Sequence, residues 1–324
     1  MINTLLDFCL NLIILITIVF SVFMIINSIG LRLSKDNEPL IYVEDIGRKQ
    51  FEDDQDLKLE VGILKGKIPD YCEKGENKLV ILELDGDTSA SDVDFFKDEV
   101  TAAINLCKAE PDKFEILIKI NSGGGVVNGY GLLASQINRF KKYKIKTTAS
   151  VDLIAASGGY LGACAADKII AAPFAYIGSI GVISSSFNYS EILEKVGISF
   201  DEFTAGDSKS TVSQYRKINA SQKEEYNREL DAIHKAFIKH VQSNRDIDSS
   251  DPKVFSGKHW LASEAIKFNL VDKLLTSDEF IAEKIESGHR VYAIKTKLPK
   301  RDIGLIDSMI KMASKKILNH TNYK

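Results

Sequence analysis

Two glycine-rich loops constrain the fold of this chain more than any other feature of its sequence. Each loop follows a short apolar run that reads as a buried strand, and each precedes a stretch with helical spacing of apolar residues. Loops that leave neighbouring parallel strands meet at one edge of the sheet, where open α/β folds bind ligands. The strand, loop and helix are Phe114–Ile120, 121–126 and Val127–Phe140 in the first case, and Lys146–Leu153, 155–159 and Tyr160–Ala166 in the second.

The same alternation of strand and helix begins earlier and continues later. Leu79–Leu84 reads as a buried strand, and the next segment reads as a helix that begins with Ser91 as its cap and ends near Cys107. Ser199–Phe203 is a further strand-like run, and Ser221–Ser243 predicts a long charged amphipathic helix. The alternation predicts an α/β fold in which helices flank a parallel sheet.

The second loop has the composition of a turn that exposes a serine nucleophile. Ser157 lies in A-A-S-G-G-Y, with small residues on both sides. Glycines let a substrate approach a hydroxyl at a sharp strand-to-helix turn, and the helix N-terminus stabilises a developing oxyanion. In the alternative interpretation, Ser157 only caps the helix and the glycines only make the turn.

The first loop could supply main-chain N–H groups to an oxyanion hole beside that serine. Its glycines could also cradle a phosphate, but the chain contains neither G-x-x-x-x-G-K-[ST] nor G-x-G-x-x-G. The phosphate interpretation is therefore the weaker one.

A serine nucleophile also needs a base. None of the five histidines lies in a recognisable triad motif. A lysine in an apolar pocket is the other candidate, because desolvation favours the neutral amine, which accepts the serine proton. Lys209 follows the strand-like run in T-A-G-D-S-K. From composition alone, Lys209 is expected to be an ordinary surface lysine.

Several motifs resemble the bacterial signal peptide peptidase family, the SppA and SohB serine peptidases. They occur in the family's order and spacing over about residues 78–281. The loop I-N-S-G-G-G-V-V-N-G-Y-G-L-L-A-S-Q is most similar to the SohB branch. The other motifs are A-A-S-G-G-Y, A-A-D-K-I-I-A-A-P-F-A-Y-I-G-S-I-G-V-I, T-A-G-D-S-K, G-K-H-W-L-A-S-E-A-I and N-L-V-D-K.

The resemblance implies a ClpP/crotonase-type spiral fold and a role for each matching residue. It makes Ser157 the nucleophile, Lys209 the general base and Ser179 the hydroxyl that orients the lysine amine. The N–H groups of Gly124 and Gly158 would form the oxyanion hole. No cofactor or metal is implied, and a ring-like homo-oligomer is expected.

One position departs from the family pattern. The family usually has proline where this chain has Gly123. Without proline the loop has more conformational freedom, which would lower activity.

The N-terminal segment predicts a retained membrane anchor. Phe8–Leu31 contains no charged residue and is long enough to span a bilayer. Met1–Asp7 has no Lys or Arg and no cleavage site follows, so a removed signal peptide is disfavoured. Arg32 and Lys35 after the span favour a cytoplasmic catalytic domain, whereas the family resemblance favours an extracytoplasmic one.

The remaining segments complete a four-part organisation. We expect an anchor at 1–31, a charged membrane-proximal linker at 32–77, a serine peptidase domain at 78–295 and a basic amphipathic tail at 296–324. The net charge of −3 gives no reason to expect nucleic acid as a partner. The four cysteines have no metal-ligand spacing and are expected to be unpaired structural thiols.

The family resemblance, together with the apolar N-terminal segment, implies a serine endopeptidase anchored in the bacterial plasma membrane. Its substrates would be remnant signal peptides or misfolded membrane polypeptides. A catalytically weak or inactive scaffold of the same fold is a second hypothesis, which the departure at Gly123 motivates. A crotonase-like enzyme acting on acyl-CoA thioesters is a third.

Overall fold

The computed structural model describes residues 40–46, 76–206, 209, 212–247 and 252–297. The chain divides into two units, Val43–Lys295 and Met1–Tyr42 together with Thr296–Lys324. None of the helices within the described ranges is long and apolar enough to cross a bilayer. The predicted anchor, most of the predicted linker and all of the predicted C-terminal tail except residues 296–297 lie outside these ranges; the described part of the linker includes strand β1, Leu40–Asp45.

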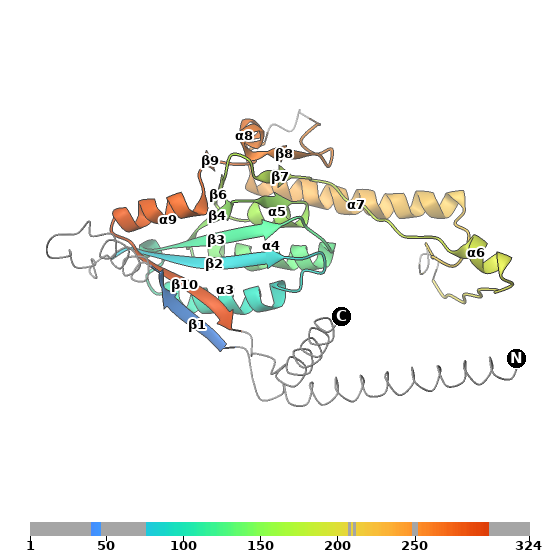
Figure 1. Cartoon of the computed structure of the whole chain (residues 1–324), viewed down its shortest axis with the longest axis horizontal. Helices are drawn as coiled ribbons and strands as arrows, with labels where there is room; N and C mark the ends of the chain where they lie inside the picture. The colour runs from blue at the N-terminus through green and yellow to red at the C-terminus, as the bar shows by residue number, and fades with distance from the viewer. Residues whose placement is uncertain (1–39, 47–75, 207–208, 210–211, 248–251, 298–324) are drawn as a thin grey trace, which may run out of the picture. The chain divides into compact units, whose positions relative to one another are not determined.

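A mixed β-sheet with helices on both faces forms the centre of the fold (Figure 1). Its main path runs β1-β10-β2-β3-β4-β6-β9, and a branch is added where β5 pairs with β3 and β7, and β7 pairs with β8. The strands are β1 Leu40–Asp45, β2 Lys78–Gly86, β3 Phe114–Ser122, β4 Lys146–Val151, β5 Ile154–Ala156, β6 Lys168–Ala171, β7 Tyr176–Gly178, β8 His259–Leu261, β9 Lys273–Leu274 and β10 Arg290–Lys297.

The helices follow the amphipathic segments of the sequence. The α-helices are α3 Val93–Cys107, α4 Val127–Lys142, α5 Gly158–Ala163, α6 Ser190–Lys195, α7 Ala220–Asn244, α8 Ala262–Ala265 and α9 Ser277–Glu286. Two 3₁₀ turns, Pro111–Lys113 and Ile266–Phe268, connect neighbouring elements.

The central strands, which pair in parallel, are buried on both faces. In β2, Leu79, Val80, Ile81 and Leu82 are all at most 3% exposed. Leu79 and Ile81 point to one face and join a cluster with Ile281 of α9. The opposite face carries α3, which packs against β2 and α4, while α4 packs against α5. This double covering explains why the sequence showed continuous apolar runs rather than strict alternation.

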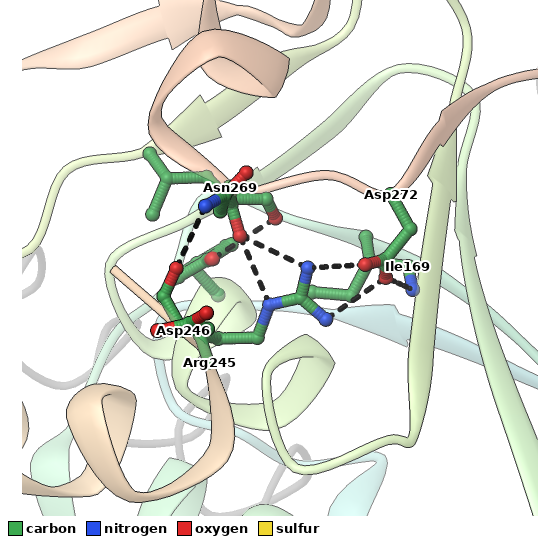
Figure 2. A network of polar contacts seen from close by, with 7 residues as sticks. Ile169, Arg245, Asp246, Asn269 and Asp272 are labelled. Atoms are coloured by element: carbon green, nitrogen blue, oxygen red, sulfur yellow. Dashed lines mark hydrogen bonds and ion pairs between the residues drawn. The ribbon is translucent and has the colours of Figure 1, made fainter. Parts of the chain in front are cut away.

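The C-terminal end of α7 is anchored by an ion pair between a buried arginine, Arg245, and a partly exposed carboxylate, Asp272 (Figure 2). Arg245 is 8% exposed and donates to both carboxylate oxygens of Asp272, at 2.8 and 2.7 Å. It also donates to the carbonyl oxygen of Asn269 at 3.1 and 2.9 Å. Asp272 in turn accepts from the N–H of Ile169 at 2.6 Å. The guanidinium therefore joins α7 to β6 and to the turn before β9.

Three expectations need correction. The sheet is mixed rather than parallel, because β8 pairs with β7 in antiparallel orientation. Ser199–Phe203 forms no strand. Ser91 does not cap α3, which begins at Val93 after Asp92. The N–H and hydroxyl of Ser91 instead donate to the Asp87 carboxylate and close the preceding turn.

Candidate active site

The two glycine-rich loops meet, as the sequence predicted. Ser122, the last residue of β3, pairs with Ala155 of β5, so the loops leave adjacent strands. Gly124 has a φ of +89°, and a Cβ there would lie 2.8 Å from Ser157 Cβ and 2.6 Å from Gly158 N. Because real Cβ atoms do not approach so closely, only glycine fits beside the serine.

Ser157 occupies the sharp turn between β5 and α5. Its φ of 51° and ψ of −119° are rare for a residue with a side chain and cost about 1–3 kcal/mol. Its N–H donates to the carbonyl oxygen of Gly178 at 2.8 Å, which holds the turn against β7. The side chain is half-buried and makes no capping hydrogen bond to α5. The interpretation of Ser157 as a helix cap is therefore not supported.

Ser179 lies beside Ser157 because β5 and β7 are parallel neighbours. The register pairs Ala156 with Gly178, so the two serines follow paired residues. Ser179 also has a positive φ, 53°, and its N–H donates to the carbonyl oxygen of Lys258 at 2.9 Å. Both hydroxyl-bearing residues are thus fixed by their backbones at the ends of adjacent strands.

Gly158 presents an N–H at the start of α5. As the first helical residue it has no intrahelical acceptor for this group, and no other described residue accepts from it. The glycine is buried against Tyr130, since a Cβ there would lie 2.4 Å from Cγ of the tyrosine ring. This N–H is therefore available to an oxyanion at Ser157.

The N–H of Gly124 is engaged in this structure. It donates to Ser122 Oγ at 3.1 Å, and Ser122 Oγ donates to the carbonyl oxygen of Gly86 at 3.0 Å. Ser122 Oγ also forms a 2.5 Å hydrogen bond with the hydroxyl of Tyr130, which donates to the carbonyl oxygen of Asp87 at 2.7 Å. Ser122 and Tyr130 were not among the residues predicted for the site. A serine directly before the glycines and a tyrosine in the first turn of the next helix were the available signals.

Lys209 is not joined to the serines by any contact of the described residues. It is exposed, and its N–H donates to the carbonyl oxygen of Gly206 at 3.2 Å. Residues 207–208 and 210–211, which flank it, lie outside the described ranges. The structure brings together Ser157, Ser179, Gly124 and Gly158, but it does not bring Lys209 to them.

Two histidines of α7 lie near the site with their Nε2 atoms engaged. His234 Nε2 is 3.0 Å from the carbonyl oxygen of Ile180, and His240 Nε2 is 3.1 Å from that of Leu161. A carbonyl oxygen only accepts, so each Nε2 carries the proton. Burial lowers the pKa of His240 below its ordinary value. Neither Nε2 can therefore take a proton from Ser157 in this arrangement.

The described cysteines are inert. Cys107 and Cys164 are unpaired and buried, and burial raises the pKa of each thiol to about 12. The prediction of unpaired structural thiols is confirmed for these two residues, while Cys9 and Cys72 lie outside the described ranges. Within those ranges, no group of three or more His, Cys, Asp or Glu side chains is arranged to hold a metal ion.

Comparisons with known proteins assign the chain to a family. Residues 139–290 match the model of peptidase family S49, and residues 2–137 match the model of the S49 N-terminal region. The probable protease SohB of Haemophilus influenzae is 41% identical over 223 residues, which cover 68% of this chain and 61% of that protein. The probable protease SohB of Buchnera aphidicola subsp. Acyrthosiphon pisum is 35% identical over 257 residues, which cover 78% of this chain and 74% of that protein.

Among solved structures, a membrane-bound stomatin-specific protease in complex with a substrate peptide is similar at 16% identity and a TM-score of 0.41. That similarity covers 64% of this chain and 80% of the other. The sequence comparisons confirm the resemblance that the motifs indicated. Both family models and the two SohB relatives show that this chain belongs to peptidase family S49.

Proposed function

We propose that this chain is a membrane-anchored serine endopeptidase that cleaves peptide bonds through an acyl-enzyme. The observation that carries the proposal is the turn at Ser157. The side chain of Ser157 is half-buried, and its hydroxyl makes no capping hydrogen bond to α5. Ser157 lies on a strained strand-to-helix turn between the N–H of Gly158 and the loop that contains Gly124. This is the arrangement that a nucleophile and its oxyanion hole require.

In the proposed mechanism, Ser157 Oγ attacks the carbonyl carbon of the scissile peptide bond while its proton passes to the neutral amine of Lys209. The carbonyl oxygen becomes an oxyanion, which the N–H groups of Gly158 and Gly124 stabilise. The C–N bond breaks as the ammonium of Lys209 returns the proton to the leaving amine. Water then attacks the acyl-enzyme, gives a proton to Lys209 and releases the acid, and the proton returns to Ser157.

This mechanism requires Lys209 Nζ to reach hydrogen-bond distance of Ser157 Oγ when a peptide is bound. Catalytic hydrogen bonds often form only in the substrate complex, so the exposed position of Lys209 is compatible with this role. Ser179 would then orient the amine, since its backbone already lies beside Ser157. The family membership supports this assignment.

The proposal includes a membrane anchor, a fold type and an oligomer. Phe8–Leu31 would anchor the chain in the plasma membrane. The peptidase domain would have the ClpP/crotonase-type spiral fold. Large apolar side chains are exposed on residues 183–203, which include α6; Ile183 is 92%, Phe187 78% and Phe203 95% exposed. Figure 1 shows α6 beyond the end of the sheet. An exposed apolar surface of this kind supports a homo-oligomer.

The test of the function is covalent labelling of the purified full-length protein with a rhodamine fluorophosphonate. We expect the adduct on Ser157 by mass spectrometry, and loss of both labelling and casein hydrolysis in Ser157→Ala. Ser135→Ala is the matched control, because Ser135 is an exposed serine whose hydroxyl only donates to the carbonyl oxygen of Gly131. Hydrolysis by Ser157→Ala above a tenth of the wild-type rate would remove Ser157 from the nucleophile's role.

The same experiment separates the two alternative functions. An inactive scaffold would remain unlabelled and would not hydrolyse casein. A crotonase-like enzyme would turn over an acyl-CoA thioester in Ser157→Ala as well as in the wild type, because its chemistry needs the two N–H groups but no serine–lysine pair.

A further inference from the structure

Tyr130 contacts one half of the proposed oxyanion hole and is linked to the other half through Ser122. Its ring lies directly against Gly158, where a Cβ would approach Cγ to 2.4 Å. Its hydroxyl is hydrogen-bonded to Ser122 Oγ, and this oxygen accepts the N–H of Gly124. Tyr130 thus touches Gly158 directly and is linked to the N–H of Gly124 through one intervening atom, Ser122 Oγ.

The hydrogens of this network are constrained by its acceptors. Carbonyl oxygens can only accept. That of Gly86 lies within hydrogen-bond distance of Ser122 Oγ, and that of Asp87 within hydrogen-bond distance of the Tyr130 hydroxyl. Two arrangements keep the bond between the two hydroxyls. In one, Tyr130 donates to Asp87 and Ser122 donates to Tyr130; in the other, Tyr130 donates to Ser122 and Ser122 donates to Gly86. Either arrangement leaves a lone pair of Ser122 Oγ for the N–H of Gly124. The network therefore fixes the position of the Gly124 peptide, whose N–H donates to Ser122 Oγ.

Burial makes the network stiff. Tyr130 is fully buried and Ser122 is 2% exposed, so water does not compete for their hydroxyls. Burial also raises the pKa of Tyr130, which keeps its hydroxyl protonated. The N–H of Val126 donates to the carbonyl oxygen of Thr88 at 3.0 Å, so the glycine loop is held to the 87–90 turn at a second point.

We propose that Tyr130 and Ser122 are positioning residues, which hold the Gly124 and Gly158 N–H groups in place for the oxyanion of the transition state. The inference rests on the proposed function. The bond from Gly124 to Ser122 is between neutral groups, whereas a bond to an oxyanion is charge-assisted and roughly twice as strong. The developing oxyanion therefore draws the Gly124 N–H while the loop keeps its place.

The test is Tyr130→Phe, which keeps the ring against Gly158 and removes only the hydroxyl. We expect kcat for casein to fall about tenfold or more with KM little changed, because complete loss of one oxyanion donor costs about 100- to 1000-fold. The rate of fluorophosphonate labelling should fall by a similar factor. Tyr160→Phe is the matched control, since its fully buried hydroxyl donates to the carbonyl oxygen of Leu270 at 3.0 Å and has no link to Gly124.

Ser122→Ala and the double variant test the route. If Tyr130 acts through Ser122, the two single variants and Ser122→Ala/Tyr130→Phe should lose similar factors of kcat, rather than the product of the two. Thermal unfolding of each variant is measured alongside. A purely structural role would lower the melting temperature of Tyr130→Phe and Tyr160→Phe alike without changing the kcat of the folded enzyme.

The outcomes separate this inference from the proposed function. Unchanged kcat in Tyr130→Phe, with an active wild type labelled on Ser157, would overturn the inference alone. Multiplicative losses in the double variant would also overturn it. An unlabelled and inactive wild type would overturn the proposed function, and this inference with it.

Discussion

The main-chain N–H of Ser157 donates to the carbonyl oxygen of Gly178 at 2.8 Å, and this bond places Ser157 beside Ser179. The bond continues the parallel pairing of β5 and β7 by one residue. Both serines have positive φ angles, 51° and 53°. Two strained backbones side by side are typical of sites where function outweighs local stability.

Loss of the Ser179 hydroxyl should lower activity without disturbing the turn. A general base contributes about 10²- to 10⁴-fold to the rate, and Ser179 would help by orienting that base. We therefore expect kcat to fall about tenfold or more in Ser179→Ala. Ser179→Gly also lacks the hydroxyl but relieves the positive φ. Equal losses in the two variants would show that the hydroxyl matters, whereas recovery in Ser179→Gly would assign the effect to the backbone.

Replacement of Lys209 by arginine should be as damaging as replacement by alanine. A guanidinium keeps its proton at working pH, so Lys209→Arg cannot accept the proton of Ser157, and kcat/KM should fall about 10²- to 10⁴-fold in both variants. The control is Lys217→Arg, an exposed lysine paired with Glu194 at 3.0 Å. Near-normal kcat/KM in Lys209→Arg would mean that Lys209 only binds or steers the substrate.

Proline should be tolerated at position 123 and should raise activity. Gly123 does not have a positive φ, and a Cβ there would meet only Ile154 Cδ1 at 3.9 Å. The preceding Ser122 is in a strand, which suits a residue before proline. Proline reduces the conformational entropy that the loop loses when it becomes ordered, by about 0.4–1 kcal/mol. If this lowers the activation free energy by the same amount, kcat rises about two- to fivefold. A large loss of kcat in a folded Gly123→Pro would contradict this prediction.

Two glycines of α4 should respond to alanine in opposite directions. At Gly131 an added Cβ meets nothing within 4 Å, so Gly131→Ala should raise the free energy of unfolding by about 0.5–1 kcal/mol. At Gly129 the added Cβ would lie 2.5 Å from Ala90 Cβ. Gly129→Ala should therefore lower that free energy by about 1 kcal/mol or more. Urea denaturation measures the free energy of unfolding of both variants. A change of the same sign in the two variants would contradict the packing described here.

His240 should make the fold less stable in mild acid. Burial lowers its pKa, so below the ordinary value of about 6.5 the unfolded chain takes up a proton that the native state does not. The unfolded state then holds more protons, and the free energy of unfolding falls as the pH falls. His240→Gln should weaken this dependence in urea denaturation at pH 7.5 and 5.5. An identical pH dependence in both proteins would exclude His240 as a contributor.

The order of strands and helices and the meeting of the two glycine loops were open to prediction from the sequence alone. Periodicity and glycine placement are local properties, and β2, β3, β4, α4 and α7 appear close to where the pattern placed them. The resemblance in the motifs likewise identified the family. Ser199–Phe203 was mistaken for a strand because a segment this short has too few residues for its periodicity to distinguish a strand from a loop.

Only the tertiary structure revealed the supports of the site. The link from Asp87 through Tyr130 and Ser122 to Gly124 joins β2, α4 and β3, and it depends on the parallel register of β2 and β3. The antiparallel β8, which faces Gly178, depends on chain that returns more than 80 residues later. No local pattern encodes such contacts, because strand register and side-chain direction are set when distant segments pack together and bury their polar groups as pairs.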